Sequence, residues 1–117
     1  MIYDNNNIFA KIIRAEIPCN KIYEDDFVLS FYDINPQKKI HALVIPKGKY
    51  VDLDDFNTNA SNEEIIGLMK GITTVAKKLG ISSIDGKGYR ALANISDYGG
   101  QEVPHLHFHL FGGEKVG

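Results

Sequence analysis

The spacing of apolar residues near the N-terminus predicts a short helix. The polar residues at positions 4–7 can cap a helix, and the apolar residues that follow recur three and four positions apart. These apolar residues are Ile8, Phe9, Ile12 and Ile13. We expect the helix to run from about residue 5 to 15, and to end before Pro18 because the position preceding a proline disfavours helical backbone.

Runs rich in aromatic and β-branched residues then predict strands. Three such runs cover residues 21–24, 27–32 and 41–45, and they are separated by an acidic turn and by a turn at residues 33–36. Two more cover residues 89–95 and a segment that starts near Val103 or His105 and ends at Gly112. Because several connections are short, we expect the strands to pair mainly antiparallel.

A second helical pattern lies between the third and fourth predicted strands. Ser61 and Glu64 have the spacing of a capping box, and Gly80 is suited to end the helix. The apolar stripe consists of Ile65, Leu68, Met69, Ile72, Val75, Ala76 and Leu79. We expect this stripe to cover one face of the sheet. The prediction is therefore a single α+β domain over residues 1–117, with a five-stranded, mainly antiparallel sheet, one long helix and one short helix.

The charge and composition of the chain argue against nucleic acid and membrane partners. The formal net charge is −2 and the pI is about 6.0, so there is no basic excess for binding long DNA or RNA. The lone Cys19 cannot form an internal disulfide, which fits a reducing compartment. We find neither a signal-peptide pattern nor an apolar run long enough to cross a bilayer. We therefore expect a cytoplasmic protein without a membrane partner.

The candidate chemistry is concentrated in the last predicted strand. Three of the four histidines alternate there, at His105, His107 and His109. Alternate side chains of a strand project to the same face, so the three imidazoles are predicted to share one face while Leu106, Phe108 and Leu110 pack under the long helix. Burying three polar rings without a function would require three sets of partners. The pattern favours either a metal site or direct histidine chemistry on a phosphate.

The segment just before the histidines favours phosphate over metal. Gly99 and Gly100 allow backbone N–H groups to approach an anion closely, and Gln101 adds an amide donor. A zinc hydrolase that uses two or three of the four histidines, with His41 as a possible ligand, remains an alternative. A nucleotide-binding interaction module with incidental catalysis is a second alternative.

The chain resembles the nucleotide-binding branch of the histidine-triad family. The motif at residues 105–111 has the pattern His-x-His-x-His followed by two apolar positions. The resemblance extends over almost the whole chain, through residues 8–13, 16–18, 23–25, 31–36, 41–47 and 99–101. It implies a homodimeric hydrolase of purine-nucleotide conjugates, with AMP-amines or the corresponding GMP compounds as substrates and with no cofactor.

The resemblance also implies roles for individual residues. His107 would be the nucleophile and form a covalent nucleotidyl-imidazole, His109 would contact the phosphate oxygens, and His105 and His41 would orient the site. Asp33 would bind the ribose hydroxyls. The purine pocket would be lined by Ile8, Phe9, Ile12, Phe31 and Ile34, and the phosphate would be surrounded by Asn94, Gly100, Gln101 and Glu102.

Three departures from the family pattern affect these expectations. Glu102 occupies a position that is serine in some members, where the serine assists the leaving group. Pro104 precedes the triad where an aromatic residue is common. The Cys-x-x-Cys of zinc-carrying members is replaced by residues 7–10, so we predict no structural zinc.

Overall fold

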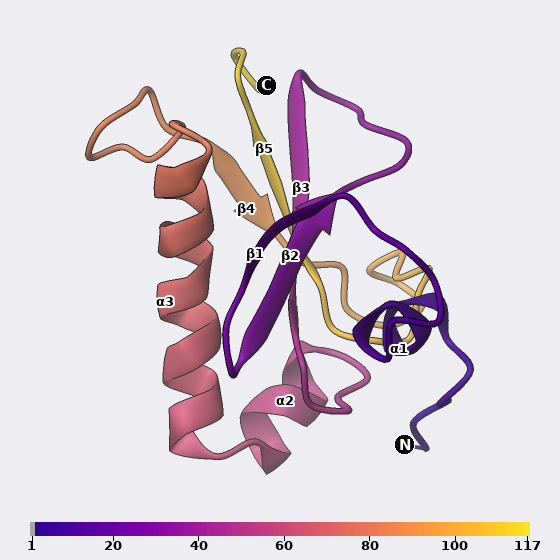
Figure 1. The fold of residues 1–117 in the computed structure, drawn as a ribbon. Helices are drawn as coiled ribbons and strands as arrows, with labels where there is room; N and C mark the ends of the chain where they lie inside the picture. The colour runs from indigo at the N-terminus through magenta and orange to yellow at the C-terminus, as the bar shows by residue number, and fades with distance from the viewer. Residues whose placement is uncertain (1) are drawn as a thin grey trace.

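Five strands form one antiparallel sheet in the order β1–β2–β3–β5–β4 (Figure 1). The computed structural model describes residues 2–117, and Met1, the first residue of the predicted domain, lies outside the described residues. The strands are β1 (Lys21–Glu24), β2 (Val28–Tyr32), β3 (Ile40–Pro46), β4 (Arg90–Leu92) and β5 (Phe108–Gly112). Together with the helices they confirm the predicted α+β class with an antiparallel sheet.

Three helices accompany the sheet: α1 (Ile8–Ile13), α2 (Leu53–Asn59) and α3 (Asn62–Lys78). The predicted capping box is present at the start of α3, where Ser61 and Glu64 each bond the other's backbone N–H. The apolar stripe of α3 faces the sheet, although Met69 at its margin is exposed. No helix within residues 2–117 has the length and apolarity needed to span a membrane.

The two faces of the sheet bury different sets of side chains. Ala42 and Val44 of β3 pack with Leu110 of β5 beneath α3. The alternate residues Leu43 and Ile45 face the opposite way and pack with α1 and β2. Figure 1 shows α3 and α1 on opposite sides of the sheet. The face on the α1 side therefore remains partly open, and it carries the histidines.

The helix α2 was not predicted, although its start has a recognisable cap. Asp52 accepts a hydrogen bond from the backbone N–H of Asp55, and Asp55 in turn accepts one from the backbone N–H of Val51. This reciprocal pair satisfies two donors at the helix start, as a capping box does. Phe56 is fully buried and fixes the short helix to the core. One buried apolar residue gives no helical period, so the hydrophobic pattern of residues 53–59 does not predict a helix.

The predicted start of the last strand is wrong. β5 begins at Phe108, so His105 and His107 precede it. Pro104 has no N–H to contribute to a ladder, and the N–H of His105 donates to the carbonyl of Val103 in a tight turn. The N–H of Leu106 donates to Tyr50, outside β3. The fourth strand is also shorter than the predicted 89–95.

Candidate functional site

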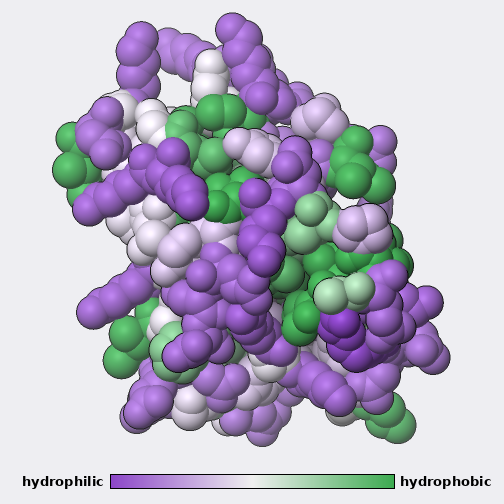
Figure 2. Space-filling model, viewed as in Figure 1, coloured by the Kyte–Doolittle hydropathy of each residue, from purple (hydrophilic) through white to green (hydrophobic). Residues whose placement is uncertain are grey.

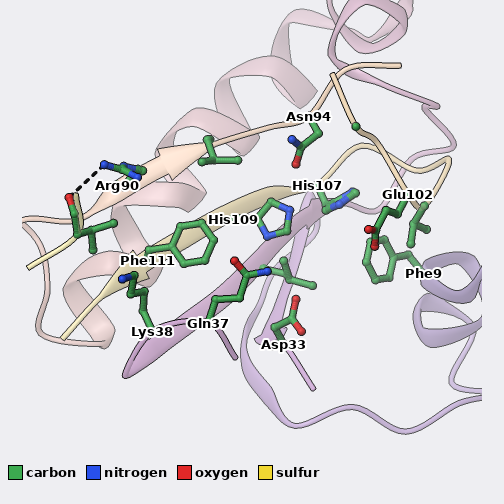
Figure 3. A pocket seen from close by; sticks show the side chains of 15 residues that line it. Phe9, Asp33, Gln37, Lys38, Arg90, Asn94, Glu102, His107, His109 and Phe111 are labelled. Atoms are coloured by element: carbon green, nitrogen blue, oxygen red, sulfur yellow. Dashed lines mark hydrogen bonds between the residues drawn. The ribbon is translucent and has the colours of Figure 1, made fainter. Parts of the chain in front are cut away.

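The pairing of β3 with β5 brings His41 and His109 together. In this register His41 lies opposite Phe111, and Leu43 lies opposite His109. His41 and His109 are therefore diagonal neighbours on one face, and their rings stand 5.2 Å apart between centroids. His107 follows at 5.0 Å from the His109 ring. Figure 3 shows His107 and His109 side by side along the floor of a cavity.

The cavity next to these rings has a volume of about 460 Å³. Its lining comes from the N-terminal helix, from the β2–β3 connection, from β3, β4 and β5, from the loop before β5 and from the segment after β5. The lining residues are Phe9, Asp33, Gln37, Lys38, Leu43, Arg90, Leu92, Asn94, Gly100, Glu102, Val103, His107, His109, Phe111 and Val116. Two of the four predicted catalytic histidines thus line the cavity directly.

His105 does not share the cavity face with the other two triad histidines, contrary to the sequence prediction. Its side chain is fully buried. Nε2 lies 2.9 Å from the carbonyl oxygen of Pro46, and Nδ1 lies 2.6 Å from the hydroxyl of Tyr3. A carbonyl oxygen can only accept, so Nε2 carries the proton and Nδ1 accepts from Tyr3. Because the chain turns at Pro104 instead of extending, alternation does not hold at this position.

His107 has its tautomer set by the backbone. Nδ1 lies 2.8 Å from the carbonyl oxygen of His105, so Nδ1 donates and Nε2 keeps a lone pair. The residue is 6% exposed, yet it lines the cavity. Within residues 2–117, the only enclosed side-chain N or O atom without a hydrogen-bond partner is Ser30 Oγ. Nε2 of His107 also has no hydrogen-bond partner within residues 2–117, yet it is not among the enclosed atoms. It is therefore accessible from the cavity.

His109 has the opposite tautomer, which is set through His41. The backbone N–H of Gln37 donates to Nδ1 of His41 over 3.2 Å, so the proton of His41 lies on Nε2. That N–H points at Nδ1 of His109, 2.9 Å away. His109 Nδ1 consequently accepts, and its proton lies on Nε2. The same Nε2 atom of His41 lies 3.4 Å from a carboxylate oxygen of Asp33.

The two cavity imidazoles are therefore complementary. Nε2 of His107 offers a lone pair, whereas Nε2 of His109 offers a hydrogen-bond donor. A lone pair beside a donor is suited to attack on an electrophilic centre whose oxygen carries negative charge, because one atom attacks and the other stabilises the charge. Main-chain atoms determine both tautomers: the carbonyl of His105 accepts from His107 directly, and the N–H of Gln37 acts on His109 through His41.

Burial keeps all four rings neutral near pH 7. Desolvation lowers the pKa of His105 and of His109 to about 4. Desolvation also lowers the pKa of His107, although its bond to the His105 carbonyl opposes the shift. The pKa of His41 is lowered by burial too, against the attraction of Asp33. A neutral ring has one donor and one acceptor nitrogen, as the tautomer assignments require.

A second, smaller hollow of about 200 Å³ adjoins the first. The two share Phe9, Asp33, Leu43 and Val103 in their linings. All five residues predicted to form a purine pocket line this second hollow, namely Ile8, Phe9, Ile12, Phe31 and Ile34. Ile34 is 87% exposed, so the hollow is open on one side. Figure 2 shows hydrophobic surface gathered next to α1, the helix that supplies three of these residues.

The loop before the triad differs from its predicted arrangement. The N–H groups of Gly100 and Gln101 donate to Asp97 and Ser96 within the loop itself, so neither is free to bind an anion. The Gln101 side chain donates to the carbonyls of Val51 and Val103 and does not line the cavity. Gln101 therefore holds the loop in position instead of facing the cavity.

The glycines of this loop serve the turn. Gly100 has a φ of +74°, and a Cβ on Gly99 would lie 2.3 Å from the carbonyl oxygen of Ile95. Asn94 fixes the loop by donating to the Gly99 carbonyl, and it lines the cavity together with Gly100 and Glu102. Of the four residues predicted to surround a phosphate, three thus border the cavity.

Several cavity residues were not predicted. Lys38 and Arg90 are the clearest examples, because each is a single basic residue in a segment without a recognisable motif. Figure 3 shows both near Phe111, at the end of the cavity opposite Phe9 and Glu102. The pairing of β4 with β5 places Arg90 opposite Phe111, but this register depends on the tertiary structure and is not visible in the local sequence.

Asp33, His41 and His109 also have the composition and spacing of a metal site, with one possible ligand atom from each within 4.8 Å of the others. The proton arrangement does not fit a metal. A histidine that binds a metal usually donates its other ring N–H to an acceptor. Here the other nitrogen of His41 faces the backbone N–H of Gln37, which is itself a donor. Coordination through Nε2 would therefore put two donors against each other.

The four histidines and most of the residues that line the larger cavity lie in a segment that matches a known domain. The HIT domain matches residues 14–116. The chain belongs to the HIT family. The family membership confirms the resemblance drawn from the histidine motif, and the antiparallel sheet agrees with the HIT fold.

Similar HIT proteins are found in several bacteria. An uncharacterised 13.2 kDa HIT-like protein of Azospirillum brasilense is 50% identical over 98% of this chain and 92% of its own length. A purine nucleoside phosphoramidase of Escherichia coli is 44% identical over 94% of this chain and 89% of its own. The solved structure of a HIT family hydrolase from Clostridium thermocellum has a TM-score of 0.86 at 38% identity, covering 97% of this chain and 96% of that one.

Proposed function

We propose that this HIT protein hydrolyses nucleoside 5′-phosphoramidates and related nucleotidyl conjugates of the AMP-amine type. The observation that carries the proposal is the pair of neighbouring Nε2 atoms with opposite roles, a lone pair on His107 and a donor on His109. The Escherichia coli relative named purine nucleoside phosphoramidase supports the substrate class. HIT family hydrolases among the similar structures support hydrolysis.

The nucleotide would lie across the two adjoining hollows. The purine would occupy the apolar hollow beside α1, and Asp33, which borders both hollows, would accept hydrogen bonds from the ribose hydroxyls. The phosphate would then lie over His107 and His109, with Asn94 and Glu102 at its margin. In this pose His41 and His105 do not touch the substrate and act as positioning residues.

The reaction would proceed in two displacements. The lone pair of His107 Nε2 attacks phosphorus, the P–N bond breaks with its electrons passing to the amine, and the amine takes a proton from water near Glu102. Water then attacks phosphorus, the bond from phosphorus to His107 breaks, and the water proton leaves to solvent. His109 Nε2–H stabilises the charge on a phosphate oxygen in both steps. The sum is phosphoramidate plus water giving nucleoside monophosphate plus amine.

An adenosine 5′-phosphoramidate conjugate tests the proposal directly. The wild-type protein should release AMP, and rapid acid-free quenching should trap AMP on a peptide that contains His107, detected by mass spectrometry. His107→Ala should lose both signals while keeping affinity for AMP. Absence of hydrolysis in the wild type, or hydrolysis that survives in His107→Ala, would refute the nucleophile assignment.

Metal dependence separates this proposal from a zinc hydrolase. Full hydrolysis by protein that elemental analysis finds free of zinc after chelation supports direct histidine chemistry. Loss of hydrolysis on chelation, with recovery on adding zinc, would favour a metal mechanism through Asp33, His41 and His109 instead.

We also propose that the protein is a homodimer related by a two-fold axis. β4 lies at one edge of the sheet and two of its three residues are exposed, so its outer backbone groups are open to pairing. Light scattering coupled to size-exclusion chromatography measures the mass of the particle. A value of twice 13.1 kDa is expected, and a monomer at micromolar concentration would contradict the proposal.

A further inference from the structure

The larger cavity continues past His109 to an end that the proposed mechanism does not use. This end is bordered by Gln37, Lys38, Arg90, Phe111 and Val116. It lies on the opposite side of the two histidines from Phe9, which borders the proposed nucleoside hollow. A phosphate over the histidines therefore has the nucleoside on one side and this unassigned end on the other.

The unassigned end carries two basic side chains. Lys38 and Arg90 both line it, and neither forms an ion pair with any carboxylate in residues 2–117. The guanidinium of Arg90 donates one hydrogen bond, to the carbonyl of Val116, which leaves further N–H groups available. Of the two acidic residues that line the cavity, Glu102 lies toward its other end, whereas Asp33 lies near His109 and Gln37 (Figure 3).

We infer that this basic end is a subsite for an anionic leaving group. The inference rests on the proposed function, because it identifies the far side of the same scissile bond. A carboxylate or phosphate on the departing amine would accept hydrogen bonds from the Arg90 guanidinium and the Lys38 ammonium. The methylene part of such a group would pass over the face of Phe111, between them. The preferred substrates are then nucleotide conjugates of acidic amines rather than of neutral or basic ones.

The chemistry of the bond cleavage is unchanged by the subsite. The P–N bond still breaks with its electrons on the amine nitrogen, which takes a proton from water, and His107 still receives the nucleotidyl group. The anionic group is separated from that nitrogen by a short linker and remains charged throughout. The basic end thus contributes binding and orientation of the leaving group, and Lys38 and Arg90 are specificity-determining residues.

Matched conjugates separate charge from shape. The adenosine 5′-phosphoramidates of β-alanine and of β-alanine amide have nearly the same shape, but only the first carries a carboxylate. We expect kcat/KM to favour the β-alanine conjugate about tenfold, the effect of one or two hydrogen bonds to a charged group. The phosphoethanolamine conjugate tells whether phosphate is preferred over carboxylate, and a preference for either anion over the amide supports the inference.

Variants test whether the two basic residues cause the preference. Lys38→Gln and Arg90→Gln should each reduce the tenfold ratio of kcat/KM between the two conjugates to about threefold or less. Lys39→Gln is the matched control, because Lys39 is the exposed neighbour and does not line the cavity. A wild-type ratio near one, or an equal loss in Lys39→Gln, would overturn the inference.

Failure of the subsite is distinguishable from failure of the proposed function. If the amide conjugate is hydrolysed without any preference for the anionic one, only the subsite is refuted. If no conjugate is hydrolysed, the affinities for ADP and AMP still test the subsite. The β-phosphate of ADP extends from the AMP position toward the leaving-group side. The wild type should then bind ADP more tightly than AMP, with the advantage lost in Lys38→Gln and kept in Lys39→Gln. Equal affinities for the two nucleotides would refute the subsite.

Discussion

Nδ1 of His107 lies 2.8 Å from the backbone carbonyl oxygen of its own neighbour two positions back, His105. This contact leaves the outer nitrogen of His107 unprotonated, whereas the bond from His41 leaves the outer nitrogen of His109 protonated. Two imidazoles 5.0 Å apart, both neutral, thus have different functions. The difference comes from their hydrogen-bond partners, and that relationship gives the predictions below.

Breaking the bond between His41 and His109 should impair catalysis without removing a substrate contact. In His41→Leu, Nδ1 of His109 loses its donor, so the ring is free to carry its proton on the wrong nitrogen. We expect kcat to fall by roughly 100-fold with little change in AMP affinity. His41→Gln retains an N–H donor of similar reach and should recover part of the loss. Steady-state kinetics on an AMP-amine conjugate measures kcat of both variants. Equal kcat values for His41→Leu and His41→Gln would contradict a role of the bond from His41 to His109.

The hydroxyl of Tyr3 should contribute to stability through the buried His105. In Tyr3→Phe the Nδ1 atom of His105 loses the only partner it has within residues 2–117. An unsatisfied buried acceptor costs about 1–3 kcal/mol, so the free energy of unfolding should decrease by that amount in urea titrations. Tyr98→Phe is the control, because Tyr98 is fully exposed. Similar unfolding midpoints for the two variants would argue against the contact.

Stability should decline on mild acidification. The pKa values of His105 and His109 are about 4 in the folded protein and near 6.5 when unfolded. Between these values the unfolded chain binds more protons, so stability is fully present above about pH 7 and is lost as pH falls from 6.5 toward 4. His105 alone should contribute about 1.4 kcal/mol per pH unit in this window. Urea titrations at several pH values measure the slope, which should be smaller in His109→Asn; a flat profile would contradict the assignment.

The acid limb of the activity profile should also be displaced. Burial lowers the pKa of His107, so its lone pair should persist below pH 6.5. We expect kcat/KM for an AMP-amine conjugate to remain near its neutral value at pH 6.5 and to decline only at lower pH. Rates with His107→Ala supply the background from acid-catalysed cleavage. A half-maximal rate at pH 6.5 or above would mean that the ring is not desolvated as described.

Most of the fold could be predicted because several helices and strands are marked by caps or by the period of their apolar residues. The capping box at Ser61 and the stripe after it define α3 without reference to the rest of the chain. The alternation of Leu106, Phe108 and Leu110 correctly assigned these residues to the core beneath α3. By contrast, α2 buries a single phenylalanine, and its Asp52–Asp55 cap is visible only when an aspartate is allowed in place of the usual glutamate.

The candidate site was predictable in composition but not in arrangement. Alternation placed His107 and His109 together, yet it failed for His105 because the turn at Pro104 directs that ring toward Tyr3, about a hundred positions away along the chain. Glycines in a row suggested anion binding at Gly99 and Gly100, where close packing on Ile95 and a positive φ explain them instead. Lys38 and Arg90 enter the site only through the order and register of the strands, which no local pattern encodes.

The proton positions in this site depend on main-chain atoms at Pro46, His105 and Gln37. The side chains of Pro46 and Gln37 can change without altering the carbonyl or N–H that determines the tautomer of the histidine ring. Relatives that retain the course of the backbone can therefore diverge widely in sequence while keeping one imidazole as attacking group and its neighbour as donor. A deletion or insertion in residues 35–40 would displace the N–H of Gln37. It would therefore disturb the proton positions of His41 and His109 more than most substitutions within the cavity.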